Sequence, residues 1–240
     1  MQSGKTSLLQ TWLLALATHC PPSQLHLYLV DSRRLGLAPL MDLPHVRAYA
    51  DSPELAELTI GEVGRLLSER QVAFDAARRK TDTPIGDVQA LAQAPAIVLA
   101  LDDLLDRHDD LLAPRDDSDN SKSEQWRRQL ATMARQGRRL GFHLLVAGPV
   151  GQLSRYNEPI TTLTEVPIGF RLDAPSDDAL FSLRLPYSER EKALPIGQGY
   201  WVQRGQPHKV QTATAQVGAP TVQAWVKQLA EAWRKSAANK

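Results

Sequence analysis

The feature that most limits the fold is the alternation of buried strands and amphipathic helices along the chain. Apolar residues at helical spacing predict helices over 5–18, 53–79, 124–140 and 220–235. Short apolar or β-prone runs predict strands over 25–30, 46–50, 96–101, 142–147 and 166–172, and a hairpin over 199–204 and 208–213. Strands separated by helices predict an α/β fold with a mostly parallel sheet and helices on both faces.

Composition excludes several classes of function. The 240 residues are 42% hydrophobic and 23% charged, which is typical of a globular protein. A net charge of +1 gives no overall attraction to nucleic acid or to an acidic membrane surface. Cys20 is the only cysteine, which excludes a disulfide framework and a cysteine-rich zinc site. No apolar run reaches the roughly 18 residues of a membrane span, and we expect a cytoplasmic protein.

The start of the chain carries the second half of a phosphate-binding loop, the Walker A motif. Ser3, Gly4, Lys5, Thr6 and Ser7 lead directly into the first predicted helix. A glycine lets backbone N–H groups approach phosphate oxygens, and the positive end of the helix dipole favours them. Lys5 would neutralise the β- and γ-phosphates of ATP, and Thr6 would bind Mg²⁺ through its hydroxyl. The alternative is an ordinary helix start with an exposed lysine.

The other half of this motif is not present. In the full pattern, G-x-x-x-x-G-K-[ST], the first glycine would fall one residue before Met1, and the strand that normally feeds the loop is missing. We therefore expect a single ATPase domain over residues 1–240 that is truncated at the phosphate-binding loop. We also expect a gap or a rearrangement beside the strand at 96–101, because the missing strand would be central in the sheet.

A second motif has the form of a Walker B strand. The apolar run from Ile97 to Leu101 ends in two acids, Asp102 and Asp103. Asp102 would hold Mg²⁺ through water, and Asp103 would polarise the attacking water as the catalytic residue. The alternative is an ordinary acidic end of a strand or a helix cap. The order of the two motifs favours nucleotide binding.

Five segments together resemble FtsK/SpoIIIE-type P-loop ATPase domains. They are Gly4–Thr6, Leu27–Asp31 with Leu43–Val46, Leu101–Leu105, Arg135–Leu144, and Gly197–Val202 with Val210–Gln211. The chain is most similar to a downstream domain, most simply the last one, of an EccC-type type VII secretion ATPase. The resemblance implies a RecA-like P-loop NTPase fold, a C-terminal hairpin and helix, and neighbouring ATPase domains or protomers as partners.

The departures from the family pattern concern hydrolysis. DNA translocases of this group carry a polar residue at the end of the strand after Walker B, where this chain has Ala147-Gly148-Pro149. Asp103 is also shorter than the usual glutamate. Both departures predict ATP binding with slow or no hydrolysis, and the resemblance implies a regulatory or substrate-docking role. In the EccC group, one such domain receives the C-terminal signal of a small helical secreted substrate.

Arginines gather on one side of the helix predicted at 124–140. At 100° per residue around the helix axis, five arginines fall within an arc of roughly 120°. They are Arg127, Arg128, Arg135, Arg138 and Arg139. This face could be solvated, could meet DNA phosphate, or could meet a neighbouring ATPase domain, with Arg138 and Arg139 reaching that neighbour's nucleotide. A DNA motor should be strongly basic, so a DNA translocase domain is the less favoured alternative.

Contact with the inner face of the cell membrane is expected only through an upstream region or a partner.

Other side chains have simpler interpretations. His45 and His143 are expected to have structural roles, in a loop and in a strand, rather than to bind metal. Trp225 and Trp233, eight residues apart on the last helix, are expected to pack in the core or against another domain. Lining a groove for a substrate helix is the alternative for the two tryptophans.

Overall fold

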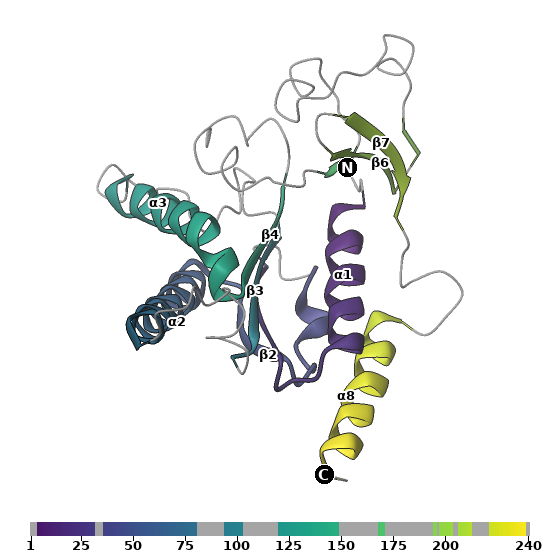
Figure 1. Cartoon of the computed structure of the whole chain (residues 1–240). Helices are drawn as coiled ribbons and strands as arrows, with labels where there is room; N and C mark the ends of the chain where they lie inside the picture. The colour runs from purple at the N-terminus through teal and green to yellow at the C-terminus, as the bar shows by residue number, and fades with distance from the viewer. Residues whose placement is uncertain are drawn as a thin grey trace.

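The computed structural model describes residues 4–31, 36–80, 94–102, 120–148, 168–170, 194–195, 197–203, 206–212 and 221–238. A four-stranded parallel sheet has the order β2-β1-β3-β4, and a three-stranded antiparallel sheet has the order β5-β6-β7 (Figure 1). The strands are β1 (Leu25–Asp31), β2 (Val46–Ala50), β3 (Ala96–Asp102), β4 (Phe142–Ala147), β5 (Ile168–Phe170), β6 (Gln198–Gln203) and β7 (Gln206–Gln211). The helices are α1 (Lys5–His19), η1 (Ala38–Leu40), α2 (Pro53–Lys80), α3 (Asn120–Gly137), η2 (Arg138–Leu140) and α8 (Val222–Ala238).

Strand β3 is the centre of the parallel sheet. It pairs with β1 on one side and with β4 on the other along nearly its whole length. The expected gap beside this strand is therefore wrong, because β1 and β4 occupy both of its sides. Among the described residues, β4 has β3 as its only strand partner. The parallel register brings the last residues of β1, β3 and β4, namely Asp31, Asp102 and Ala147, to the same edge of the sheet.

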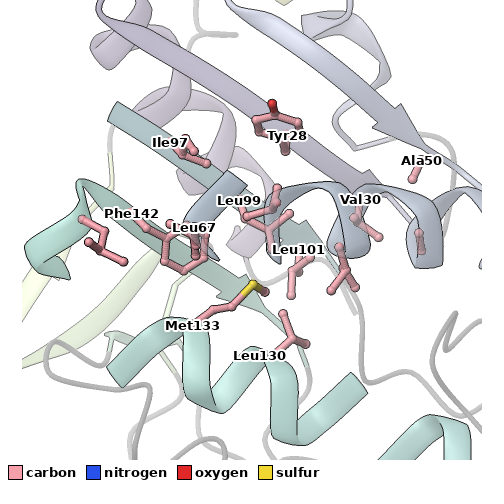
Figure 2. Packing of buried hydrophobic residues seen from close by; sticks show 14 of the residues in the cluster. Tyr28, Val30, Ala50, Leu67, Ile97, Leu99, Leu101, Leu130, Met133 and Phe142 are labelled. Carbon is pink, nitrogen blue, oxygen red and sulfur yellow. The ribbon is translucent and has the colours of Figure 1, made fainter. Parts of the chain in front are cut away.

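Helices α2 and α3 cover one face of the sheet, and α1 and α8 lie on the other (Figure 1). Figure 2 shows Leu130 and Met133 of α3 pointing toward Leu99 and Leu101 of β3. On the opposite face, the even-numbered residues of β3 pack with Leu13 of α1 and with α8. The predicted sheet with helices on both faces is confirmed. No described helix is long and apolar enough to cross a membrane.

The helix predicted at 124–140 ends earlier than expected. α3 stops at Gly137 and continues as the 3₁₀ turn η2. A Cβ at Gly137 would lie 2.8 Å from Phe142 Cβ, so only glycine allows the chain to turn this closely onto β4. Since a 3₁₀ turn has a different angular spacing, Arg138 and Arg139 do not continue the face of α3 as the helical wheel predicted.

His45 joins three elements at the end of the sheet away from Asp102. Its side chain is fully buried, and its Nε2 lies 2.8 Å from the carbonyl oxygen of Cys20, directly after α1. The ring of Trp233, from α8, stands edge-on to it with centroids 6.0 Å apart. Trp233 Nε1 also donates to the carbonyl oxygen of Ala17, at 2.9 Å. Trp233 therefore packs as expected, whereas Trp225 is 45% exposed.

The buried His45 should make stability depend on pH. Burial lowers its pKa, nearby Arg47 lowers it further, and the contact with Cys20 opposes the shift. Because its pKa is lower in the folded state, His45 makes its full contribution to the free energy of unfolding above the unfolded pKa of about 6.5. This contribution is lost as pH falls through the folded-state pKa. We expect His45 to contribute a slope of up to about 1.4 kcal/mol per pH unit in this window.

The slope is measured by urea unfolding between about pH 7.5 and 5. His45→Gln keeps a donor but does not titrate, so its slope should be shallower than that of the parent. Some slope should remain, because burial also lowers the pKa of His26 and of His143. Equal slopes for the parent and His45→Gln would contradict this prediction.

Candidate functional site

The first turn of α1 has the geometry of an anion-binding helix start. Gly4 precedes it in the left-handed conformation, with φ 98° and ψ 4°, which a glycine adopts without strain. The turn contains no acidic residue, and no side chain caps it. Its backbone N–H groups and the helix dipole therefore suit a phosphate. Lys5, Thr6 and Ser7 all lie in this turn and are half-buried.

Thr6 and Asp102 meet although they lie 96 residues apart in sequence. Thr6 Oγ1 donates a hydrogen bond to Asp102 Oδ2 at 2.8 Å. Asp102 is 3% exposed, and it lies at the carboxyl end of the central strand. The structure thus brings together the two side chains that the sequence predicted as magnesium residues.

The donor set fits Mg²⁺. A hydroxyl and a carboxylate are the hard oxygen ligands that this ion prefers. Among the described residues there is no cluster of three or more His, Cys, Asp and Glu side chains that would form a complete metal cage. Such a cage is not required, because Mg²⁺ at nucleotide sites takes its other ligands from phosphates and water.

Two predicted site residues lie outside the described residues. They are Ser3, expected at the phosphates, and Asp103, expected to act on water. The end of β4, where the sequence predicted no polar side chain to orient a water, is described. Ala147 pairs with Asp102 in the register and is buried. Its methyl group offers no hydrogen bond to a water molecule beside Asp102.

Arg138 and Arg139 lie at the opposite edge of the sheet from Thr6 and Asp102. They form η2 immediately before β4, where the carbonyl oxygen of Gly141 accepts a hydrogen bond from the N–H of Ile97 at the start of β3. Both arginine side chains are exposed. The length of the strands separates them from the first turn of α1 in their own chain.

The sequence prediction missed a close approach of the segment after β1. A Cβ on Gly36 would overlap Asp102 Oδ2 and would lie 2.7 Å from Thr6 Cγ2. Gln10, buried on α1, donates a hydrogen bond to the carbonyl oxygen of Gly36. A glycine five residues after an acid-ended strand was the available signal, but the local pattern does not give the path of such a loop.

The antiparallel sheet also reaches the site. A Cβ on Gly4 would lie 3.2 Å from the Cα of Gly197, the residue before β6. Gly197 has φ 79°, and its carbonyl oxygen accepts hydrogen bonds from the N–H and the hydroxyl of Thr212, at 2.8 and 3.0 Å. The base of the β6–β7 hairpin is therefore built directly against the start of α1.

Several known proteins are similar to this chain in sequence. The ESX secretion system protein EccC of Geobacillus thermodenitrificans is 29% identical to this chain over 150 residues. These residues are 60% of this chain and 10% of that protein. DNA translocase FtsK of Mycobacterium tuberculosis is 22% identical over 217 residues, which are 85% of this chain and 24% of that protein. This chain therefore spans only a small part of the relatives it matches.

Solved structures show the same fold. ATPases 2 and 3 of EssC from Geobacillus thermodenitrificans superpose with a TM-score of 0.73 at 22% identity, over 97% of this chain and 43% of that one. ATPases 2 and 3 of Thermomonospora curvata EccC, in complex with a signal sequence peptide, superpose with a TM-score of 0.71 at 21% identity. The superposition covers 97% of this chain and 41% of that one. The FtsK/SpoIIIE family model matches residues 1–155. With a P-loop ATPase fold and a family match over more than half its length, the chain belongs to the FtsK/SpoIIIE family.

Proposed function

We propose that residues 1–240 form one ATP-binding domain of a type VII secretion-like motor ATPase, with weak hydrolysis and a regulatory or substrate-docking role. The observation that carries the proposal is the hydrogen bond between Thr6 and Asp102. It joins the start of a helix suited to phosphate with the acid at the end of a buried parallel strand. Such a junction is where P-loop ATPases hold the metal of a bound nucleotide.

Each residue has a role in this proposal. Backbone N–H groups from Ser3 to Ser7 hold the phosphates, and Lys5 neutralises their charge. Thr6 and Asp102 hold Mg²⁺, which supplies charge stabilisation at the transferred phosphoryl group when it is bound. Asp103 orients the attacking water.

Arg138 and Arg139 are proposed to act on the nucleotide of a neighbouring domain or protomer. Their exposed position at the far edge of the sheet supports a role between domains rather than at their own site. An arginine supplied by a neighbour can stabilise the charge of phosphoryl transfer. An isolated domain lacks such a neighbour.

The end of β4 supports weak hydrolysis. The buried methyl group of Ala147, the register partner of Asp102, cannot hydrogen-bond an attacking water. The short carboxylate of Asp103 and the need for a neighbour's arginine act in the same direction.

Two measurements test ATP–Mg²⁺ binding and weak hydrolysis. Calorimetry should show that the chain binds ATP more tightly with Mg²⁺ than in EDTA. A phosphate-release assay should show turnover well below the ~1–100 s⁻¹ that is usual for phosphoryl-transfer enzymes. Equal affinity with and without Mg²⁺ would contradict the metal site, and several turnovers per second would contradict weak hydrolysis.

The secretion assignment is supported by the relatives. One structural neighbour, EccC of Thermomonospora curvata, was solved with a signal sequence peptide bound to its ATPases 2 and 3. We propose that this domain works beside other ATPase domains in a similar complex and that a small helical substrate docks through its C-terminal signal. It would lie in the cytoplasm and meet the inner face of the membrane through other parts of that complex.

A DNA translocase domain is the second candidate. The match to FtsK of Mycobacterium tuberculosis covers 85% of the chain, more than the 60% covered by EccC. A net charge of +1 disfavours it, because phosphate contacts dominate DNA affinity. Tight, salt-dependent binding of duplex DNA would favour this candidate over a secretion ATPase.

A further inference from the structure

A second carboxylate lies beside Asp102 at the edge of the parallel sheet. Asp31 ends β1 and is the register partner of Asp102. Along β1, Leu27 and Leu29 belong to the core on the α1 face, and Asp31 follows them by the two-residue alternation of a strand. Asp31 is only 1% exposed. Two buried carboxylates therefore stand side by side, and the hydrogen bond from Thr6 goes to Asp102.

Asp31 anchors the chain segment that returns over the ends of the strands. Its Oδ2 accepts hydrogen bonds from the N–H of Leu37 at 2.7 Å, the N–H of Ala38 at 3.3 Å and the hydroxyl of Tyr49 at 3.2 Å. Hydrogen bonds to an ionised carboxylate are about twice as strong as neutral ones. Asp31 thus fixes the position of the backbone immediately after Gly36.

The anchored segment touches the magnesium pair. Gly36 lies so close to Thr6 and Asp102 that a Cβ in its place would overlap the Asp102 carboxylate. The carbonyl oxygen of Gly36 is held from the other side by Gln10 of α1. Gly36 is therefore clamped between Gln10 and the residues anchored by Asp31, with its bare Cα facing the Thr6–Asp102 hydrogen bond.

We propose that Asp31 is a positioning residue for magnesium and that Gly36 transmits its effect. By holding Leu37 and Ala38, Asp31 fixes the position of Gly36, the residue against which Thr6 and Asp102 pack in the geometry that the metal needs. Gly36 is required because a side chain would separate the two ligands. This inference rests on the proposed ATP–Mg²⁺ site, and it adds two residues that need not touch the metal or the nucleotide.

The effect should appear in magnesium dependence rather than in general stability. A purely structural role for Asp31 would lower the folded fraction and would weaken ATP binding equally in Mg²⁺ and in EDTA. A positioning role lowers the ratio of the two affinities, because metal-free ATP relies on Lys5 and the helix start. Changes to groups that orient metal ligands typically cost about 10- to 100-fold in metal affinity or activity.

A matched set of variants tests this prediction by calorimetry. Asp31→Ala removes the acceptor and should abolish most of the affinity gain that Mg²⁺ gives the parent, with metal-free affinity close to that of the parent. Asp31→Asn should retain the gain. Asparagine can place its amide oxygen where Asp31 has Oδ2, which accepts the three hydrogen bonds. Its NH₂ group would then replace Asp31 Oδ1, which has no hydrogen-bond partner among the described residues. Tyr49→Phe removes only one of the three donors to Asp31 and should also retain the gain.

Gly36→Ala provides the second test, because it leaves Asp31 intact and adds only a methyl group. It should reduce the Mg²⁺-dependent gain as Asp31→Ala does. If the parent shows the gain and both Asp31→Ala and Gly36→Ala keep it, the positioning role is wrong and the ATP–Mg²⁺ site stands. If the parent itself shows no gain, the proposed function is wrong, and the positioning role falls with it.

Discussion

Replacing Lys5 by alanine is expected to weaken ATP binding by about 10- to 150-fold. Hydrogen bonds to charged groups are worth about 1.5–3 kcal/mol, and each 1.4 kcal/mol is a factor of ten in affinity. Lys5 is the basic side chain in the first turn of α1, beside the left-handed Gly4. The loss should appear both with and without Mg²⁺, because the lysine acts on phosphate and not on the metal.

Calorimetry with ATP measures this effect. Lys227→Ala is the matched control, because Lys227 is exposed on α8 and the net charge changes by the same amount. The control should bind ATP with the parent's affinity. Equal affinity in the parent and Lys5→Ala would contradict the assignment of the phosphate site to the start of α1.

Replacing Leu99 by alanine is expected to lower the free energy of unfolding by about 2–5 kcal/mol. Leu99 is fully buried in the middle of β3, and its strand has partners on both sides. Removing its side chain leaves a cavity at the centre of the cluster shown in Figure 2. The neighbouring strands cannot close this cavity without losing their register.

Urea unfolding, followed by tryptophan fluorescence, measures the change. Leu58→Ala deletes the same atoms from a side chain that is 69% exposed on α2, and it should change stability by no more than about 0.5 kcal/mol. Similar losses at the two positions would contradict the central place of β3 in the core.

Much of this fold follows from local sequence patterns. The helical spacing in α1 and the apolar runs of β1, β3 and β4 were sufficient to predict these elements within a few residues. The meeting of Thr6 with Asp102 was also predictable. Parallel strands end at one edge of the sheet, and the helix after a phosphate-binding loop begins at that edge. The prediction needed no knowledge of side-chain packing.

Other features depend on contacts between distant segments. The neighbours of β3 could not be read from the strand itself, and a wrong neighbour led to the wrong expectation of a gap. The end of α3 at Gly137 depends on the ring of Phe142 across the turn. Asp31 had the same signal as Asp102, an acid after a buried strand. Its importance appears only when the path of residues 36–38 is known.

The central claim is that Thr6 and Asp102 hold the metal of a bound nucleotide. A crystal structure of the chain with Mg²⁺ and a non-hydrolysable ATP analogue tests it most directly. We expect the phosphates at the first turn of α1 and the metal about 2.0–2.1 Å from Thr6 Oγ1, with Asp102 next to it directly or through water. Phosphates bound away from this turn would contradict the claim. So would a metal that contacts neither Thr6 nor Asp102, either directly or through a water.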